Sequence, residues 1–446
     1  MADVVVCGAG IAGVATAFHL TRAGITDVLV VDPRAPLTLT SDKSTECYRN
    51  WWPNQPMVRL MGRSIDLLDR YARESDNVFR LNRRGYLYLT ADPEQLAAMT
   101  LQARAAAAAG AGELRTHHSV ADGYEPAATE GFANAPTGAD LFVDGDLLRR
   151  HFPFVSDRVI GGLHARTAGW LSAQQLGTWL LEQAEAAGAR FVRATVVAVE
   201  IVAGEIASVT LDNGDTVPAG SFVNAAGPLL PEVGRMVGVE LPVYSEVHAK
   251  TGFRDHLGAL PRNAPMIIWN DPQTVAWTTE ELAYLGAEMR RDLIAEMPSG
   301  CHARPEGGPD SPWILGLWEY HLDVREPEWP IPTDPLYTEV VLRGLATMVP
   351  ALGAYQEHQP EAMVDGGYYT KTEENRPLAG PVGPRGSYVC GALSGFGIMA
   401  ACGVAELVAT AISGGQLPNW AHWFQLSRYE DPDYLATVAE EDSGQL

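Results

Sequence analysis

The feature that most constrains this chain is a glycine-rich turn close to its start. Residues 4–6 form a short apolar run typical of a buried strand, and Gly8-Ala9-Gly10-Ile11-Ala12-Gly13 follows at once. Apolar residues then recur at helical spacing up to Gly24, and a second apolar run at 28–31 ends at Asp32. This pattern predicts a strand, a tight turn, a helix and a parallel strand, the unit that opens many nucleotide-binding folds.

Each glycine of the GxGxxG turn has its own physical purpose. Gly8 permits the tight turn, Gly10 lets the backbone approach a pyrophosphate, and Gly13 lets the helix pack closely on the sheet. The start of the helix offers free N–H groups to the phosphates. Asp32, about 20 residues further on, is placed to accept hydrogen bonds from ribose hydroxyls, and an acid there disfavours a 2′-phosphate. The unit therefore predicts binding of FAD or NAD rather than NADP.

Composition excludes several classes of protein. The 446 residues are 46% hydrophobic and 20% charged, an ordinary globular balance. The net charge of −23 makes broad binding of nucleic acid or of an anionic membrane unexpected. The five cysteines include no CxxC pair, so we expect neither a disulfide framework nor a metal site, as suits a cytoplasmic protein. Without a signal peptide or an apolar run of about 18 residues, no membrane span is expected.

Other elements can be read at lower resolution. Helical patterns cover residues 65–73, 95–109, 174–187 and 403–412. Apolar alternation on both sides of Asp212-Asn213-Gly214 predicts a β-hairpin with its turn at these residues.

Two later motifs decide between FAD and NAD. Asn224-Ala-Ala-Gly-Pro228 follows a predicted strand, and Gly391-Ala-Leu-Ser-Gly-Phe-Gly-Ile-Met399 leads into a helix near the C-terminus. With the N-terminal unit, these motifs resemble the superfamily of D-amino acid oxidase, glycine oxidase and monomeric sarcosine oxidase. Gly169-Trp-Leu-Ser172 and Tyr369-Thr-Lys-Thr372 extend the resemblance, which reaches from end to end of the chain with two weakly matched stretches between.

The resemblance implies an α/β fold. A Rossmann-type FAD-binding domain would be interleaved with a mixed-sheet α+β substrate domain. The FAD-binding domain would take residues 1–84, 151–240 and 362–446, and the substrate domain residues 85–150 and 241–361.

The resemblance also implies where FAD lies. The helix N-terminus after the second motif would stabilise negative charge on the reduced flavin. Gly367 stands where monomeric sarcosine oxidase has the cysteine that bonds its flavin, so we expect non-covalent FAD. The residues expected at the cofactor are Gly8, Gly10, Ile11, Ala12, Gly13, Asp32, Ser41, Lys43, Ser44, Thr45, Val197, Ala226, Gly227, Gly391, Ser394, Gly395, Gly397, Ile398 and Met399.

An aromatic segment after the expected flavin loop holds the first substrate candidates. Arg49 would offer a forked contact to a carboxylate, and Trp51 or Trp52 a face for an amine cation or an apolar ring. The alternative for all three is packing in the core. Met399 replaces the lysine that holds the substrate carboxylate in monomeric sarcosine oxidase. Of the two residues that hold the substrate carboxylate in monomeric sarcosine oxidase, this chain therefore keeps at most one, Arg49. The missing lysine favours a secondary or N-methylated amine as substrate.

Tyr320 and His321 resemble a Tyr-His pair that lines the sarcosine oxidase site. His321 could orient the substrate or hold a proton near neutral pH, and a plain surface or core histidine is the alternative. Tyr369 lies in a better-matched segment and is expected to face the flavin. We therefore take Tyr369, His321 and Arg49 as the catalytic candidates, with Tyr320 as a further substrate contact.

The chain has three lysines, Lys43, Lys250 and Lys371, all in or beside segments expected near the cofactor. Some flavin oxidases use a nearby lysine to favour superoxide formation from O₂. Leu317 stands at the matching position, so either another lysine serves or O₂ is not the natural acceptor.

These features predict an FAD-dependent oxidase or dehydrogenase of an amine or amino acid. Hydride would pass from the carbon next to a neutral amine nitrogen to flavin N5, and the imine would hydrolyse. Its partners would be a small-molecule amine and O₂ or another electron acceptor, while the oligomeric state stays open. An alternative is an FAD-dependent dehydrogenase of a hydroxy acid or alcohol, with His321 or His248 as the base. A third is an FAD-binding subunit of a larger complex.

Overall fold

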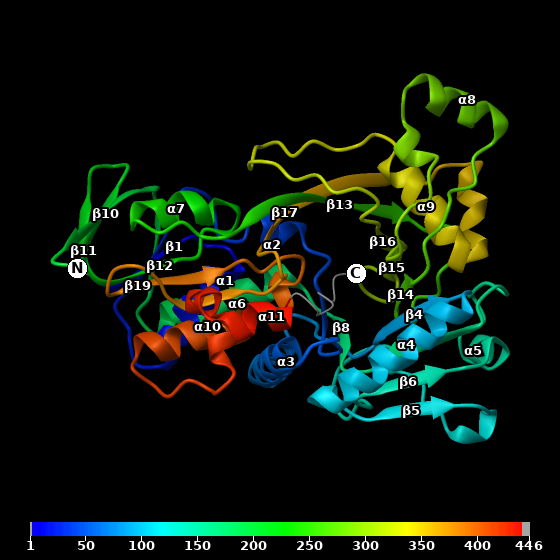
Figure 1. Ribbon diagram of the computed structural model, residues 1–446, viewed down its shortest axis with the longest axis horizontal. Helices are drawn as coiled ribbons and strands as arrows, with labels where there is room; N and C mark the ends of the chain where they lie inside the picture. The colour runs from blue at the N-terminus through cyan, green and yellow to red at the C-terminus, as the bar shows by residue number, and fades with distance from the viewer. Residues whose placement is uncertain (1, 439–446) are drawn as a thin grey trace.

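The computed structural model describes residues 2–438, and two large sheets dominate it (Figure 1). The predicted N-terminal unit is present as β1 (Ala2–Cys7), α1 (Ile11–Arg22) and β2 (Val28–Asp32). β1 pairs in parallel with β2 and with β12 (Thr216–Asn224). The other strands of this eight-stranded sheet are β9 (Arg190–Arg193), β10 (Val196–Val202), β11 (Glu205–Leu211), β18 (Leu378–Pro381) and β19 (Ser387–Gly391).

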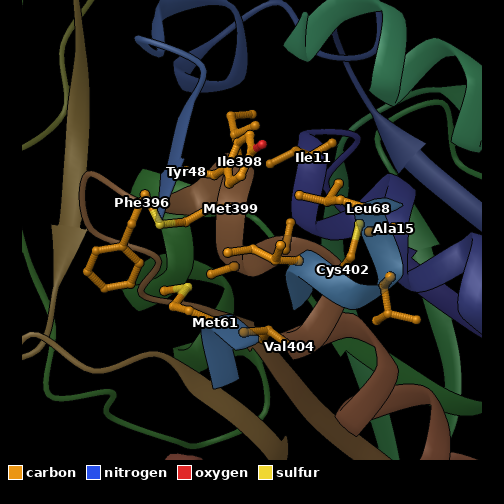
Figure 2. Close-up of a cluster of buried hydrophobic side chains, with 14 of the residues drawn as sticks. Ile11, Ala15, Tyr48, Met61, Leu68, Phe396, Ile398, Met399, Cys402 and Val404 are labelled. Carbon is orange, nitrogen blue, oxygen red and sulfur yellow. The ribbon is translucent and has the colours of Figure 1, made fainter. Parts of the chain in front are cut away.

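One face of the first sheet is covered by helices that share an apolar core. α3 (Gln55–Glu74) and α10 (Gly397–Ile412) pack together, and α10 and α6 (Ala173–Ala186) both pack on α1. Figure 2 shows this cluster, with Ile11 from α1 and Met61 from α3 near side chains of α10. The core therefore holds the start of α1 and the start of α10 in one unit.

The second sheet has nine strands. Its order is β17-β13-β16-β15-β14-β4-β7-β6-β5. The long strands β13 (Tyr244–Arg254) and β17 (Ala362–Lys371) pair antiparallel and extend from this sheet toward the first (Figure 1). The others are β4 (Tyr86–Thr90), β5 (Leu114–His117), β6 (Ala139–Phe142), β7 (Gly161–Ala165), β14 (Met266–Trp269), β15 (His302–Pro305) and β16 (Trp313–Leu317).

Short elements complete the structure. β3 (Cys47–Arg49) and β8 (Ala168–Trp170) form a two-stranded sheet. The remaining α-helices are α2 (Thr40–Lys43), α4 (Pro93–Ala106), α5 (Gly145–His151), α7 (Leu230–Met236), α8 (Thr279–Ala287), α9 (Tyr337–Met348) and α11 (Pro432–Val438). No helix within residues 2–438 is both long and apolar enough to cross a membrane. All five cysteines are buried free thiols.

The α/β fold class is confirmed, but two helices begin earlier than predicted. α3 begins at Gln55 rather than at 65, because the Asn54 side chain accepts the N–H of Met57 at 3.2 Å and Pro56 fits the first turn. α10 begins at Gly397 rather than at 403, directly after the glycine-rich turn. In both cases the predicted start marked only the later, more regular part of the helix.

The domain ranges stay a prediction, although the sheets place two strands differently from them. β7 and β17 lie in ranges assigned to the FAD-binding domain, yet both pair into the second sheet. β7 lies between β4 and β6, and β17 pairs with β13 along ten residues. Strand pairing thus groups both with the sheet expected for the substrate domain.

Replacing Gly13 by Ala should destabilise the fold. An added Cβ would lie 1.9 Å from the carbonyl oxygen of Gly8, so α1 would have to move off the sheet. We expect a loss of about 1–3 kcal/mol, as for other overpacked sites, seen as a lower Tm in thermal unfolding.

Gly62→Ala is the matched control, because Gly62 lies within α3 and a Cβ there meets nothing within 4 Å. It should leave Tm unchanged or raise it slightly. Equal effects of the two substitutions would contradict the packing role of Gly13.

Candidate active site

A cavity of about 1090 Å³, including the space at its open mouth, lies between the two sheets. Its walls come from the turn after β1, the loop after β2, the turn after β12, strands β13 and β17, and the turn before α10. The carboxyl ends of the parallel strands β1, β2 and β12 therefore all meet this space. In an open α/β sheet this is the edge at which ligands bind.

In the glycine-rich turn after β1, the backbone faces the cavity without side chains to cover it. Gly8 has φ +110°, and a Cβ there would lie 2.4 Å from the carbonyl oxygen of Ala225. Only glycine meets both conditions, so the turn after β1 and the turn after β12 can approach each other closely. Such a bare turn at a helix N-terminus suits a pyrophosphate.

Asp32 and Ser41 order the polar groups beside this turn. The Asp32 carboxylate accepts the N–H of Ala9 and the N–H of Arg34, both at 2.9 Å. Ser41 accepts the N–H of Ile11 at 2.9 Å, which brings the loop after β2 to the start of α1. A half-buried carboxylate at the end of β2 therefore faces the place where a ribose would lie.

The opposite end of the cavity is formed by the turn before α10. Ser394 has φ +47°, and its N–H donates to the carbonyl of Thr370 at 3.0 Å, which ties the turn to β17. A Cβ on Gly395 would lie 2.3 Å from the ring of Tyr369, so glycine permits this contact. No side chain caps the N-terminus of α10. Its positive end can therefore stabilise negative charge in the cavity.

Titratable side chains alternate along the wall made by β13 and β17. Glu246, His248 and Lys250 are two residues apart on β13, so their side chains share one face. The ring of His248 stacks on that of Tyr369 from β17, with centroids 3.6 Å apart. Lys250 donates from Nζ to the carbonyl of Ser44 at 2.8 Å. Burial lowers the pKa of Lys250 and raises that of Tyr369 well above its usual value.

Most residues predicted at the cofactor line this one cavity, although their roles stay predictions. They are Gly8, Gly10, Ile11, Ala12, Asp32, Ser41, Lys43, Ser44, Ala226, Gly227, Gly391, Ser394, Gly395, Gly397 and Ile398, with Tyr369 beside them.

Four residues predicted at the cofactor do not line the cavity. Gly13 packs against Gly8 inside the turn. Val197 lies on β10 with 48% of its surface exposed, and Met399 packs in the apolar core (Figure 2). The carbonyl of Thr45 accepts two N–H groups of Arg304, at 2.7 and 3.0 Å.

The predicted substrate residues divide between the core and a second cavity. Arg49 is buried, donates to the hydroxyl of Tyr88 at 2.7 Å, and lies 4.3 Å from the ring centroid of Trp52. Trp51 and Trp52 belong to the apolar core around α3. None of these three lines the first cavity.

Tyr320 and His321 line a separate cavity of about 750 Å³ on the far side of β13. Tyr320 donates to Asp334 at 3.4 Å. This cavity shares His248 and Ala249 with the first one. The structure therefore separates Tyr320 and His321 from Tyr369, with His248 between them.

The prediction missed His248 as part of the cofactor cavity and named it only as a base for alcohol oxidation, whereas Lys250 was expected in or beside a segment near the cofactor. The segment Glu246-Val-His248-Ala-Lys250 carries the signal, because charged residues at every second position of a strand share one face. An unusual charged face of this kind, within a strand otherwise well buried, indicates a polar site.

The glycine turns, the Asp32 carboxylate and the helix N-termini around the first cavity are the groups that a flavin dinucleotide needs. The site is therefore that of a flavoprotein oxidoreductase. A family model described as FAD dependent oxidoreductase matches residues 3–411. The chain belongs to this family and depends on FAD.

Individual relatives are distant. The chain is 24% identical over 271 residues to the mitochondrial dimethylglycine dehydrogenase of Rattus norvegicus, which covers 60% of this chain and 28% of that protein. Among solved structures, L-proline dehydrogenase from P. horikoshii has a TM-score of 0.75 at 20% identity. Glycine oxidase from Geobacillus kaustophilus has a TM-score of 0.73 at 17% identity. Each covers 96% of this chain and 98% of its own, so these likenesses show the fold.

Replacing Asp32 by Ala should weaken FAD binding by about 10- to 100-fold, because hydrogen bonds to a charged group contribute roughly 1.5–3 kcal/mol. The measurement is the Kd for FAD from fluorescence titration of the apoprotein.

Asp27→Ala is the control, because Asp27 lies just before β2 and pairs on the surface with Arg190. It should leave the Kd unchanged. An unchanged Kd for Asp32→Ala would contradict the ribose contact.

Proposed function

We propose that this chain oxidises a C–N bond of an amine or amino acid, with a secondary or N-methylated amine as the preferred substrate class. The observation that carries this proposal is the state of the cavity histidine. Both ring nitrogens of His248 contact carboxylates, Glu246 at 3.1 Å and Glu319 at 2.8 Å. With both nitrogens engaged by carboxylates, neither is open to take a proton from a substrate hydroxyl. Oxidation of an alcohol needs such a base, whereas oxidation of a neutral amine does not.

The charges around the cavity support a neutral amine. Among the lining residues in the described part of the chain, Asp32 is the one carboxylate, and it lies at the ribose end. Lys43 and Lys250 line the wall near β13 and β17. Positive charge on Lys250 in this wall disfavours a second cation beside it, so it favours loss of a proton from a substrate ammonium group. The neutral amine is the form whose lone pair can assist C–H cleavage.

FAD, when bound, accepts the hydride from the carbon beside the amine nitrogen. The N-terminus of α10 stabilises the negative charge that develops on accepting it. Leu317, Leu393 and Ile398 line the cavity and exclude water from the reacting atoms. Tyr369 borders the cavity between β17 and the turn before α10, where it can orient the substrate.

The names of the similar proteins support an amine or amino acid substrate. Dimethylglycine, proline and glycine appear in them, and each has an amine nitrogen next to a carbon that carries hydrogen. The chain spans about 28% of the length of the dimethylglycine dehydrogenase it matches. The contacts of Arg49 with a substrate carboxylate and of His321 with the reacting groups stay predictions. So do the electron acceptor, O₂ or another, and the cytoplasmic location.

Anaerobic bleaching of the visible flavin band tests the proposal. Purified holoenzyme is mixed with N-methylated and secondary amines, with amino acids, and with matching hydroxy acids and alcohols. We expect amines alone to bleach the band, because both ring nitrogens of His248 already contact carboxylates and are not open to take an O–H proton. Readmitting air then separates an oxidase, whose colour returns at once, from a dehydrogenase.

Bleaching by hydroxy compounds alone would replace this proposal with alcohol oxidation. If no compound of the panel bleaches the flavin band although FAD is bound, the result would favour a subunit that works only within a larger complex.

FAD should be held without a covalent bond. Gly367 lines the cavity and has no side chain that could bond the flavin. Acid precipitation of the holoenzyme should leave all yellow colour in the supernatant, and the denatured chain should show no flavin fluorescence on a gel. Colour that stays with the pellet would contradict this expectation.

A further inference from the structure

A row of alternating charges passes through His248 in the cavity wall. Glu319 contacts Nδ1 of His248 at 2.8 Å, and Nε2 of His248 contacts Glu246 at 3.1 Å. Lys371 donates to the same oxygen of Glu246 at 3.0 Å. His248, Glu246 and Lys371 are each less than 9% exposed. The order is therefore anion, cation, anion, cation, provided that the imidazole keeps both protons.

The strand register explains why His248 reaches Tyr369. His248 pairs directly with Gly367 on β17, which has no side chain to fill the space between them. The imidazole lies instead over the diagonal neighbour Tyr369, with 3.6 Å between centroids and 16° between planes. The Tyr369 ring also contacts the turn before α10, where a Cβ on Gly395 would be 2.3 Å away. The ring thus touches both an imidazole and that turn.

We propose that His248 is a positioning residue, kept as an imidazolium by Glu246 and Glu319, that holds the Tyr369 ring at the edge of the cofactor cavity. An imidazolium has two N–H groups, one for each carboxylate, whereas a neutral imidazole has one. Loss of the proton leaves one carboxylate facing a lone pair. It also removes the charge that attracts the imidazolium to the face of the tyrosine ring. Nothing in this role requires His248 to touch the substrate.

The pH dependence follows from the groups around His248. Burial lowers the pKa of His248, but Glu319 and Glu246 outweigh burial, so the pKa is raised overall. The row is therefore complete below the ordinary pKa of histidine and is lost as the pH rises through the raised pKa of His248. Several titratable and charged groups face His248 or share its cavities. The first cavity and strands β13 and β17 contribute Glu246, Lys250, Tyr368, Tyr369, Lys371, Lys43, Asp32 and Cys390. The second cavity contributes Glu319, Tyr320, His321, Asp323, Asp334 and Tyr337.

The first test observes the proton itself. Holoenzyme labelled with ¹⁵N-histidine is titrated by NMR, and His248→Gln identifies the signal. We expect an imidazole with both nitrogens protonated at pH 7 and a titration above that of a free histidine. Glu319→Gln should lower its proton affinity by about tenfold or more. His358→Gln, which removes an exposed histidine, should leave this signal unchanged. A neutral tautomer at pH 7 would overturn the proposal.

The second test uses kinetics and rests on the proposed function, because it needs a substrate that reduces the flavin. With such a substrate, kcat should fall at alkaline pH, and Glu319→Gln should move that fall to lower pH. His248→Gln should lower kcat by about 10-fold or more and remove the alkaline fall. In a Tyr369→Phe background the same change should cost much less. If the losses of kcat caused by His248→Gln and Tyr369→Phe simply add in the double variant, or if the pH profile does not change, the positioning role is wrong.

The two tests fail independently. The NMR titration needs no turnover, so it decides the charge of His248 even if no amine reduces the flavin. FAD content of each variant, read from its visible spectrum, separates a lost fold from a lost interaction. A His248→Gln protein that binds FAD fully, yet keeps the parental kcat and pH profile, would leave His248 without the role proposed.

Discussion

The close contact between the turn after β1 and the start of α1 is the constraint on which the rest of the structure depends. A Cβ on Gly13 would lie 1.9 Å from the Gly8 carbonyl, so helix and strand are as near as two backbones can be. α1 in turn supports α10, whose N-terminus closes the other end of the cavity. The two ends of the cofactor site are therefore joined through one apolar core, which Figure 2 shows. A shift of α1 would change the distance between them.

The first sheet supplies the cofactor end of the cavity, and the second supplies the chemistry. The parallel strands end in glycines and one acid, which suit the uniform parts of a dinucleotide. β13 and β17 bring an aromatic ring, a histidine and a lysine to the far wall. The short side chains of the first group leave room, whereas the long ones of the second fill it. This division explains how one cofactor site can serve different substrates when only the second sheet changes.

Local sequence predicted the first group well, because its signals are short-range. The positive φ of Gly8, the tight packing of Gly13 and the acid at Asp32 all follow from one contiguous unit. The second group depends on which strands pair, and this no local pattern reveals. Arg49 illustrates the limit, because its hydrogen bond to Tyr88 joins β3 to β4 across 39 residues of chain. Val197 shows the same, since a resemblance at low identity does not fix the register of an exposed edge strand.

The absence of a side chain at Gly367 links two properties that look unrelated. It takes away the atom through which a flavin could be bonded to β17, and it opens the space opposite His248. Any larger residue there would also crowd the loop after β2, since a Cβ would lie 3.1 Å from that of Lys43. With the space open, the imidazole can lean onto Tyr369 and reach Glu319 at once. The non-covalent binding expected for the cofactor and the charge proposed for His248 thus both depend on one glycine.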